Sequence, residues 1–205
     1  MIRLSADQSS DDKAYDDAMI KLPRTIRLDP SDSFVFARAA EPGEWAVSGS
    51  FVFGDCDDPT ALGQKQRVAL RSGFLGIDSL GWSTLTIVSE ATEVERQGAV
   101  ERLAAQLLRH FGAPDPDAAR HAAEDEIAFA ASLCDHPLQT LLAVQRSIED
   151  GGIRERFRTL KLRDPTPGAD GLHRHARAFT ILEADGDEEV AEQVDLRSLV
   201  NRERD

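Results

Sequence analysis

The chain has 205 residues, of which 41% are hydrophobic and 30% are charged, and its formal net charge is −13 at pH 7. A chain of this length can bury a sizeable core, so neither disulfides nor metal ions are needed for it to fold. The acidic balance disfavours general binding of nucleic acid, which depends on basic patches that displace counterions from phosphates.

The first folded elements are predicted to be strands. Residues 1–20 are rich in Ser and Asp and have no apolar period, which is typical of a disordered leader. Residues 22–28 then alternate apolar and polar side chains and predict a half-buried strand. After a turn, Phe34 and Phe36 are expected on one face of a second strand, because they are two residues apart.

Three further strands are predicted before the first long helix. Residues 45–53 alternate again, and Gly49 among them indicates a bulge or a close approach of another group to the backbone. An acidic loop separates this strand from two more, at residues 68–77 and 82–88. Five consecutive strands with short connections predict an antiparallel meander.

Two consecutive helices are predicted in the middle of the chain. Thr92 and Glu95 have the spacing of a capping box, and an apolar stripe with a period of 3.6 follows and ends at Gly112. Asp115 then offers an N-cap carboxylate, followed by a proline in the first turn, for a second helix that runs to about Asp135. The many alanines on its apolar side favour close packing against a neighbouring helix or sheet.

The last third of the chain returns to extended character. Residues 141–148 and 153–162 are expected to form a hairpin, although the second arm also fits the spacing of a helix. Residues 164–175 are predicted to be a loop or linker. A strand at residues 177–184 and a short tail at residues 201–205 complete the chain.

These elements predict a single α+β domain over residues 21–200. Its architecture is expected to be an antiparallel sheet with two consecutive helices packed on one face, because alternating strands leave their other face to water. The ends, residues 1–20 and 185–205, carry eight of the thirteen net negative charges, so the body is close to balanced. Terminal acids keep a protein soluble, and they can also attract basic protein partners.

The location of the protein is predicted from what the chain lacks. Cys56 and Cys134 are the only cysteines, which excludes a disulfide framework and a structural zinc knuckle. No stretch approaches the roughly 20 apolar residues that span a bilayer. The first twenty residues also lack the apolar run of a signal peptide. We therefore expect a cytoplasmic protein without a membrane partner, a metal or a cofactor.

Glu126 is the residue of the second helix that most suggests chemistry. At 100° per residue it lies only about 60° from the centre of the apolar face. A carboxylate there is either paired or has a raised pKa, because burial penalises its charge. It could act as a general base or a metal ligand in a pocket between helix and sheet, with Trp45 and Trp82 as walls. The alternative is a carboxylate at the rim, paired with an arginine such as Arg71 or Arg24.

A basic strip is predicted on the second arm of the hairpin. Arg154, Arg156 and Arg158 share one face if that arm is a strand, and they could bind an anionic ligand, RNA or an acidic protein. Phe157, the aromatic residue available for stacking, would face the other side, which weakens the RNA interpretation. The alternative is an exposed strand whose arginines pair with nearby acids and discourage edge-to-edge aggregation.

The remaining motifs are better explained by structure than by chemistry. His121 and Asp125 fall on the face of the second helix opposite its apolar stripe, so they are expected to point at water. Cys134 projects into that stripe, where a free thiol acts as a small hydrophobic group. The glycines of SGFLGIDSLGW meet neither phosphate-binding fingerprint and are interpreted as turn and packing residues.

Five stretches of the chain carry a resemblance to a known family: RTIRLDPSDSFVF, AEPGEWAVSGSFVF, SGFLGIDSLGWSTL, EDEIAFAASLCDHP and SIEDGGIRERFRTL. Over residues 22–160 the sequence resembles an uncharacterised family of alphaproteobacterial cytoplasmic proteins that carries only a domain-of-unknown-function label. The resemblance implies no activity, so no catalytic residue is carried over from it.

Two classes of function follow from these observations. The absence of a catalytic constellation, the acidic ends and the basic strip favour a non-enzymatic accessory or interaction protein whose partner is another protein. The alternative is a small-molecule-binding protein or a small enzyme that uses the pocket containing Glu126. A pocket in which Glu126 meets a second polar group would favour this alternative.

Overall fold

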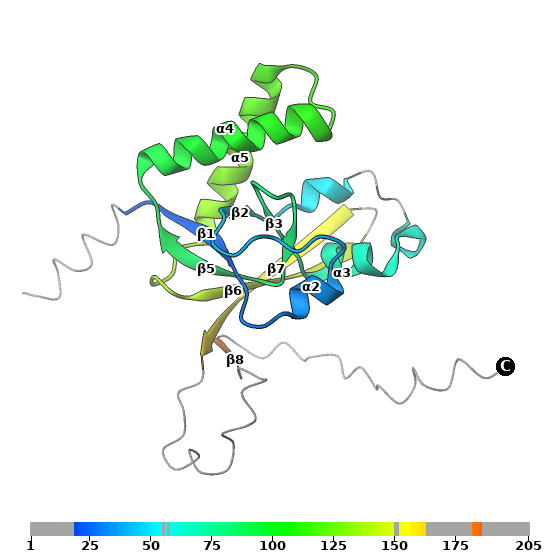
Figure 1. The fold of residues 1–205 in the computed structure, drawn as a ribbon, viewed down its shortest axis with the longest axis vertical. Helices are drawn as coiled ribbons and strands as arrows, with labels where there is room; N and C mark the ends of the chain where they lie inside the picture. Colours follow the sequence, from blue (N-terminus) through cyan, green and yellow to red (C-terminus); the bar gives the residue numbers. More distant parts are fainter. Residues whose placement is uncertain (1–18, 55, 57, 150–151, 163–181, 186–205) are drawn as a thin grey trace, which may run out of the picture.

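The computed structural model describes residues 19–54, 56, 58–149, 152–162 and 182–185, and it has an α+β fold (Figure 1). The strands are β1 (Lys21–Ile26), β2 (Ala46–Val47), β3 (Phe74–Gly76), β4 (Trp82–Ser83), β5 (Leu85–Glu90), β6 (Leu141–Glu149), β7 (Gly152–Leu162) and β8 (Leu182–Asp185). The α-helices are α2 (Ser31–Val35), α3 (Gln64–Ser72), α4 (Glu93–His110) and α5 (Pro116–Ser132), and the 3₁₀ helices are η1 (Ser50–Phe53) and η2 (Pro59–Ala61).

The strands form two antiparallel sheets. The larger sheet has the order β1-β5-β6-β7-β8, and the smaller one has the order β2-β3-β4. The long helices α4 and α5 lie together on one side of the strand layer, as Figure 1 shows, so the predicted fold class is confirmed. Among the described residues, none of the helices combines the length and the apolar character that crossing a membrane requires.

The predicted five-strand meander is wrong. Strand β1 pairs with β5, which is far from it in sequence, and the segment between them builds the smaller sheet and two helices. The larger sheet is completed by the hairpin that follows the helices, because β5 pairs with β6 through Leu85–Ala143 and its neighbours.

The predicted second strand is the short helix α2. Residues two apart share a face in a strand but lie about 200° apart around a helix. Phe36 is accordingly buried, with 1% of its surface exposed, whereas Phe34 is 72% exposed. The helix is anchored by the buried carboxylate of Asp32, which accepts hydrogen bonds from the Thr84 hydroxyl and backbone amide.

The strand predicted over residues 68–77 is mostly the helix α3. The chain forms β3 only after the helix ends at Gly73. The helix begins where the Gln66 side chain accepts a hydrogen bond from the Gly63 amide at 3.1 Å, and it buries Ala69 and Leu70. Short apolar runs do not distinguish a buried strand from a buried helix, which explains the error.

The strand predicted over residues 45–53 stops after β2 and continues as η1. The break is at Gly49, whose φ of 79° is in the left-handed region that favours glycine. A Cβ atom at this position would lie 2.6 Å from Leu75 Cβ and 3.1 Å from Trp82 Cζ3. The predicted close approach to the Gly49 backbone is therefore confirmed.

Both long helices form where they were predicted. Thr92 and Glu95 make a reciprocal capping box, in which the Thr92 amide donates to the Glu95 carboxylate at 2.9 Å and the Glu95 amide donates to the Thr92 hydroxyl at 3.2 Å. Gly112, with a φ of 72°, follows the end of α4. Asp115 caps α5 by accepting a hydrogen bond from the Ala118 amide at 2.8 Å. The buried side of α5 is mostly alanine, as expected from its sequence: Ala119, Ala123, Ile127 and Ala130.

The predicted hairpin is confirmed as β6 and β7, so the second arm is a strand and not a helix. The two arms pair in continuous register from Leu141–Leu160 to Glu149–Gly152. The last predicted strand is present as β8, although residues 177–181 lie outside the described part of the chain. Residues 1–18 of the predicted leader, the linker and the tail also lie outside it, whereas Met19 and Ile20 lie inside it, and the Ile20 carbonyl accepts a hydrogen bond from the Ala91 amide.

Candidate functional site

The centre of the polar interior is Arg146, whose side chain has no exposed surface. It points from β6 toward α3 and the end of β2. Its Nε donates to the Glu155 carboxylate at 2.7 Å, and Nη1 donates to the Gly73 carbonyl at 2.7 Å. Its Nη2 donates to the Ser48 carbonyl, and a longer bond from Nη1 reaches the Leu70 carbonyl at 3.3 Å.

The buried charge of Arg146 is compensated from several sides. Glu155 lies directly opposite it on β7 and also accepts a hydrogen bond from the Ser48 hydroxyl. The carbonyls at the end of α3 add the negative end of a helix dipole. Burial lowers the pKa of Arg146, and the hydrogen bond and charge of Glu155 oppose that change. A buried arginine keeps its charge under these conditions because its donors are matched by acceptors.

Glu126 is a second carboxylate near this arginine, and it lacks a comparable set of partners. The residue is half-buried on α5, and its Oε2 atom is buried without a hydrogen-bond partner among the described residues. Burial, and then the negative charge of Glu155, raise the pKa of Glu126 to about 7, while the charge of Arg146 partly opposes them. The sequence left open whether this carboxylate is paired or has a raised pKa, and the structure favours the raised pKa.

The two arginines suggested as partners of Glu126 lie elsewhere. Arg24 stacks over the Trp45 ring, with its Cζ atom 3.5 Å from the ring centroid, and it pairs with Glu95 at 3.3 Å. Arg71 is exposed on α3. Arg146 supplies the opposing positive charge instead.

The tryptophans suggested as pocket walls belong to the core. Trp45 is buried beneath Arg24. Trp82 stacks on Phe53 with a centroid distance of 5.3 Å and fills the space that Gly49 leaves open. The structure does not bring Trp45, Trp82 and Arg71 together with Glu126 around one cavity.

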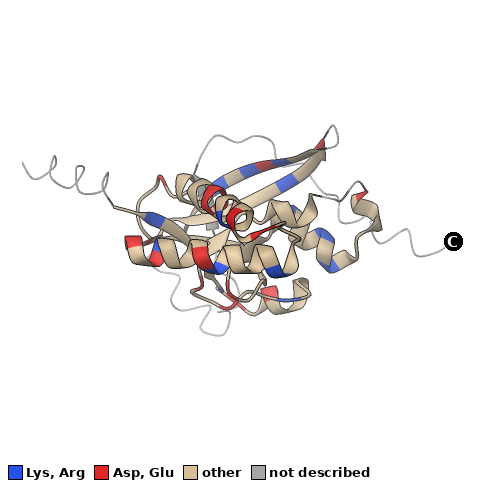
Figure 2. Ribbon diagram, turned by 90° about the horizontal axis from the view of Figure 1, so that it is seen from above, with Lys and Arg blue, Asp and Glu red and all other residues tan. Residues whose placement is uncertain are grey.

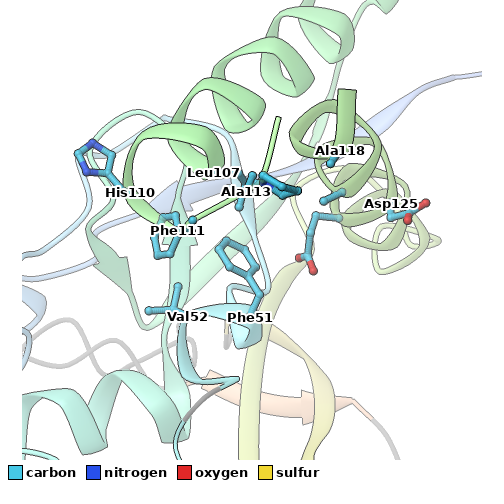
Figure 3. Close-up of a pocket in the computed structure, with 12 residues that line it drawn as sticks. Phe51, Val52, Leu107, His110, Phe111, Ala113, Ala118 and Asp125 are labelled. Atoms are coloured by element: carbon cyan, nitrogen blue, oxygen red, sulfur yellow. The ribbon is translucent and has the colours of Figure 1, made fainter. Parts of the chain in front are cut away.

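An open groove of about 700 Å³ lies between the α4–α5 connection, the first half of α5 and η1. Figure 3 shows the rings of Phe51 and Phe111 side by side within it, and their centroids are 5.2 Å apart in an edge-to-face arrangement. The groove is lined by Phe51, Val52, Leu107, His110, Phe111, Gly112, Ala113, Pro114, Ala118, Ala122, Asp125 and Glu126.

The titratable side chains of the groove differ in direction. In Figure 3 the His110 ring and the Asp125 carboxylate both point away from the two phenylalanine rings. The side chain of Asp125 is 75% exposed and lies 4.0 Å from His121. Glu126 is thus the half-buried charge of a groove whose other walls are mostly apolar. Such a site can hold an apolar body and one polar group, which is the usual composition of a ligand pocket.

The other motifs have the structural roles expected of them. Cys134 is buried against the sheet, and burial raises the pKa of its thiol to about 12, so it is not a nucleophile. His136 is exposed and lies beyond the end of α5. In the described part of the chain, no three His, Cys, Asp or Glu residues lie close enough to hold a metal ion.

The glycines of SGFLGIDSLGW are packing positions, as predicted. A Cβ atom at Gly73 would lie 2.7 Å from the Trp82 ring. A Cβ atom at Gly76 would lie 2.5 Å from the Glu44 carboxyl group, and one at Gly81 would lie 2.4 Å from the Ala39 carbonyl oxygen.

The basic strip lies on the outer face of the hairpin. Arg154, Arg156 and Arg158 are exposed on β7, and in Figure 2 blue segments recur along the hairpin strands with red segments between them. Arg154 pairs with Glu149 at 3.0 Å. Phe157 faces the interior, where it packs edge-on against Phe129 with a centroid distance of 5.7 Å. The predicted division of the two faces of β7 is confirmed.

Sequence reasoning missed Arg146, Glu155 and Ser48, the residues that form the polar interior. A signal for Arg146 was present in the alternation of β6. Leu142, Val144 and Arg146 occupy every second position, so the arginine belongs to the buried face. Its acceptors on α3 gave no signal, because that segment was interpreted as a strand.

The fold and the groove define an α+β protein with a half-buried carboxylate in an open groove. Residues 19–177 match a family described as "Family of unknown function (DUF6505)", and the chain belongs to this family. No curated protein and no solved structure matches the chain.

Replacing Arg146 tests its role as the link between the sheet, α3 and the end of β2. We expect Arg146→Met to lower the free energy of unfolding by about 3–5 kcal/mol, because it leaves Glu155 buried without its charge partner. Urea denaturation of the full chain measures the change. The matched control is Arg158→Met on the exposed face of β7, which should change it by no more than about 0.5 kcal/mol. Equal effects of the two substitutions would contradict the assignment.

Glu126 makes the stability of the protein depend on pH. Its folded pKa of about 7 lies above the ordinary 4.5, so the folded state holds this proton more tightly than the unfolded state. The resulting stability is fully present below pH 4.5 and is lost as the pH rises through 7. We expect Glu126→Gln to remove this loss, so that between about pH 5.5 and 8.5 the variant gains about 1–2 kcal/mol relative to the wild type, allowing for solvent screening.

The comparison uses urea denaturation at both pH values. Glu124→Gln is the matched control, because Glu124 does not line the groove and forms an ion pair with Arg120 at 3.1 Å. This control should follow the pH dependence of the wild type. A Glu126→Gln variant with the same pH dependence as the wild type would show that Glu126 is already ionised in the folded protein.

Proposed function

We propose that the protein is a non-enzymatic binding protein of the bacterial cytoplasm that holds a small, largely apolar ligand in the groove between α4, α5 and η1. The observation that carries the proposal is the pairing of an aromatic floor, Phe51 and Phe111, with one half-buried carboxylate, Glu126. The cytoplasmic location is supported by the two free cysteines and by the family resemblance described above.

The geometry favours binding over catalysis. General acid–base chemistry needs a second group positioned around the same reacting atom. His110 and Asp125, the other titratable side chains of the groove, point away from its aromatic floor (Figure 3). Apolar contact alone gives useful affinity in such a site, since each buried CH₂ group contributes about 0.8 kcal/mol.

A groove-blocking substitution tests the proposal. N-phenyl-1-naphthylamine is a neutral probe whose fluorescence rises in apolar surroundings, and we expect the wild-type protein to bind it saturably. Ala122 lines the groove, so Ala122→Trp should weaken probe binding at least about tenfold by filling the site, a change equivalent to 1.4 kcal/mol. Fluorescence titration measures the affinity.

The matched control is Ala128→Trp on the same helix. Ala128 is exposed and does not line the groove, so this variant adds the same fluorophore without filling the site. It should retain the affinity of the wild type. Equal binding by wild type and Ala122→Trp, or no saturable binding by the wild type, would overturn the proposal.

A second candidate function is the binding of an acidic protein partner to the basic strip. The observation in its favour is the exposure of Arg154, Arg156 and Arg158 on one face of β7, on a chain whose overall charge is negative. A polyglutamate peptide is a suitable probe of this surface, whereas the acidic balance of the protein makes nucleic acid an unfavourable partner.

Glutamine substitutions separate a specific surface from net charge. We expect the triple variant Arg154→Gln, Arg156→Gln, Arg158→Gln to weaken the binding of a labelled decaglutamate peptide at least about fivefold at low salt. The control changes the net charge equally through three exposed arginines elsewhere: Arg71, Arg109 and Arg120. Fluorescence anisotropy measures both. Equal losses in the two triple variants would show that only net charge matters.

A further inference from the structure

Among the described residues, no cation forms an ion pair with the carboxylate of the groove. Glu126 Oε2 is buried without a hydrogen-bond partner among the described residues, although the groove that Glu126 lines is open to solvent. A buried carboxylate oxygen without a donor is costly, because its hydration is lost and nothing replaces it. The cost is relieved when the group takes up a proton or when a donor enters from the groove.

Arg146 cannot be that donor, because its nitrogens are already engaged. Nε binds Glu155, Nη1 binds the carbonyls at the end of α3, including that of Gly73, and Nη2 binds Ser48. It attracts Glu126 only through space, and the charge of Glu155 acts in the opposite sense. When all three groups are ionised, two carboxylates face one guanidinium, so one negative charge is left at the groove side of the cluster.

We infer that the ligand of the groove is an amphipathic cation, with an apolar body against Phe51 and Phe111 and an ammonium group on the Glu126 carboxylate. This inference rests on the proposed function and names the class of its ligand. A primary ammonium brings the positive charge that the cluster lacks, and N–H donors for the accessible side of the Glu126 carboxylate that lines the groove. An apolar carboxylate would add a third negative charge, and an apolar alcohol would bring a donor without a charge.

The other charged groups near Glu126 act in defined directions. Asp125 precedes it on α5 and adds negative charge, which favours a cation at the rim. His110 lies on the α4 side of the groove, and a positive charge on its ring would repel a cation. A charge on His110 and a proton on Glu126 would both weaken the binding of a cation, so only a variant can separate the two residues.

Three eight-carbon probes of different charge test the inference. Octylamine, 1-octanol and octanoate are used to displace N-phenyl-1-naphthylamine from the wild-type full chain at pH 8. An alkylammonium keeps its charge up to about pH 10, as lysine does. We expect octylamine to displace the probe at a concentration at least about tenfold lower than 1-octanol, and octanoate to be the weakest competitor. This ranking needs no variant.

Glu126→Gln then assigns the preference to one residue. The variant should still bind N-phenyl-1-naphthylamine, but its preference for octylamine over 1-octanol should fall below about twofold. Glu124→Gln is the matched control and should keep the wild-type preference, because Glu124 does not line the groove. In the wild type the preference should also decrease from pH 8 to pH 5.5, and it should decrease similarly in His110→Gln.

The outcomes separate this inference from the proposed function. If 1-octanol competes as well as octylamine, or if Glu126→Gln keeps the preference for the amine, the inference is wrong although the groove still binds apolar molecules. If the neutral probe does not bind to the groove at all, the proposed function itself is wrong. A loss of the pH dependence in His110→Gln would assign it to the histidine and would also overturn the inference.

Discussion

The structure depends on one buried charge, the guanidinium of Arg146. It draws together parts of the chain that are far apart in sequence: the end of α3, the residue that follows β2, and the strand β7. Each of these segments presents a backbone carbonyl or a carboxylate that would lose a hydrogen bond if the arginine were absent. The two sheets and α3 are therefore joined by polar contacts as well as by the apolar core, and the geometry of these contacts fixes how they meet.

The same charge explains the character of the groove. Arg146 has one positive charge and two carboxylates near it, and Glu155 takes the direct hydrogen bond because it lies opposite on the paired strand. Glu126 lies on α5, and the attraction of Arg146 for its carboxylate is opposed by the negative charge of Glu155. The raised pKa of Glu126 thus follows from the placement of two carboxylates near one cation, with Glu155 fixed by the sheet register and Glu126 by the position of α5. The family match gives no activity, so this electrostatic arrangement is the most specific functional feature that the chain offers.

Secondary structure could be predicted from the sequence where the signals that determine an element lie within that element. The helices α4 and α5 have caps, stripes and stops that are all local, and they form where the pattern places them. Phe34 and Phe36 show the opposite case, because their two-residue spacing predicts a strand and gives no signal for the short helix that forms. The helix forms because the buried Asp32 carboxylate accepts a hydrogen bond from Thr84. These two residues are far apart in sequence, so no local pattern predicts their contact.

The functional residues follow the same division. The burial of Glu126 could be predicted from its angle on the helix, and the exposure of the arginines of β7 could be predicted from alternation. The positive charge that acts on Glu126 could not be predicted, because Arg146 lies on strand β6, far from α5 in sequence. The tryptophans expected to line a pocket fill the core instead. Residues that meet only through tertiary structure need the register of the sheet before their distance can be stated.

The left-handed Gly49 makes one wall of the groove rigid, which bears on the proposed binding of a ligand. Directly before it, Ser48 is held by Arg146, and directly after it begins η1, whose Phe51 lines the groove. The backbone at Gly49 is pressed between Leu75 and Trp82, so this wall has little freedom to move. A receptor surface that is already in place loses little conformational entropy when it is filled. Such a rigid wall favours affinity over breadth of recognition, because it fits ligands of one shape and does not change its conformation to fit others.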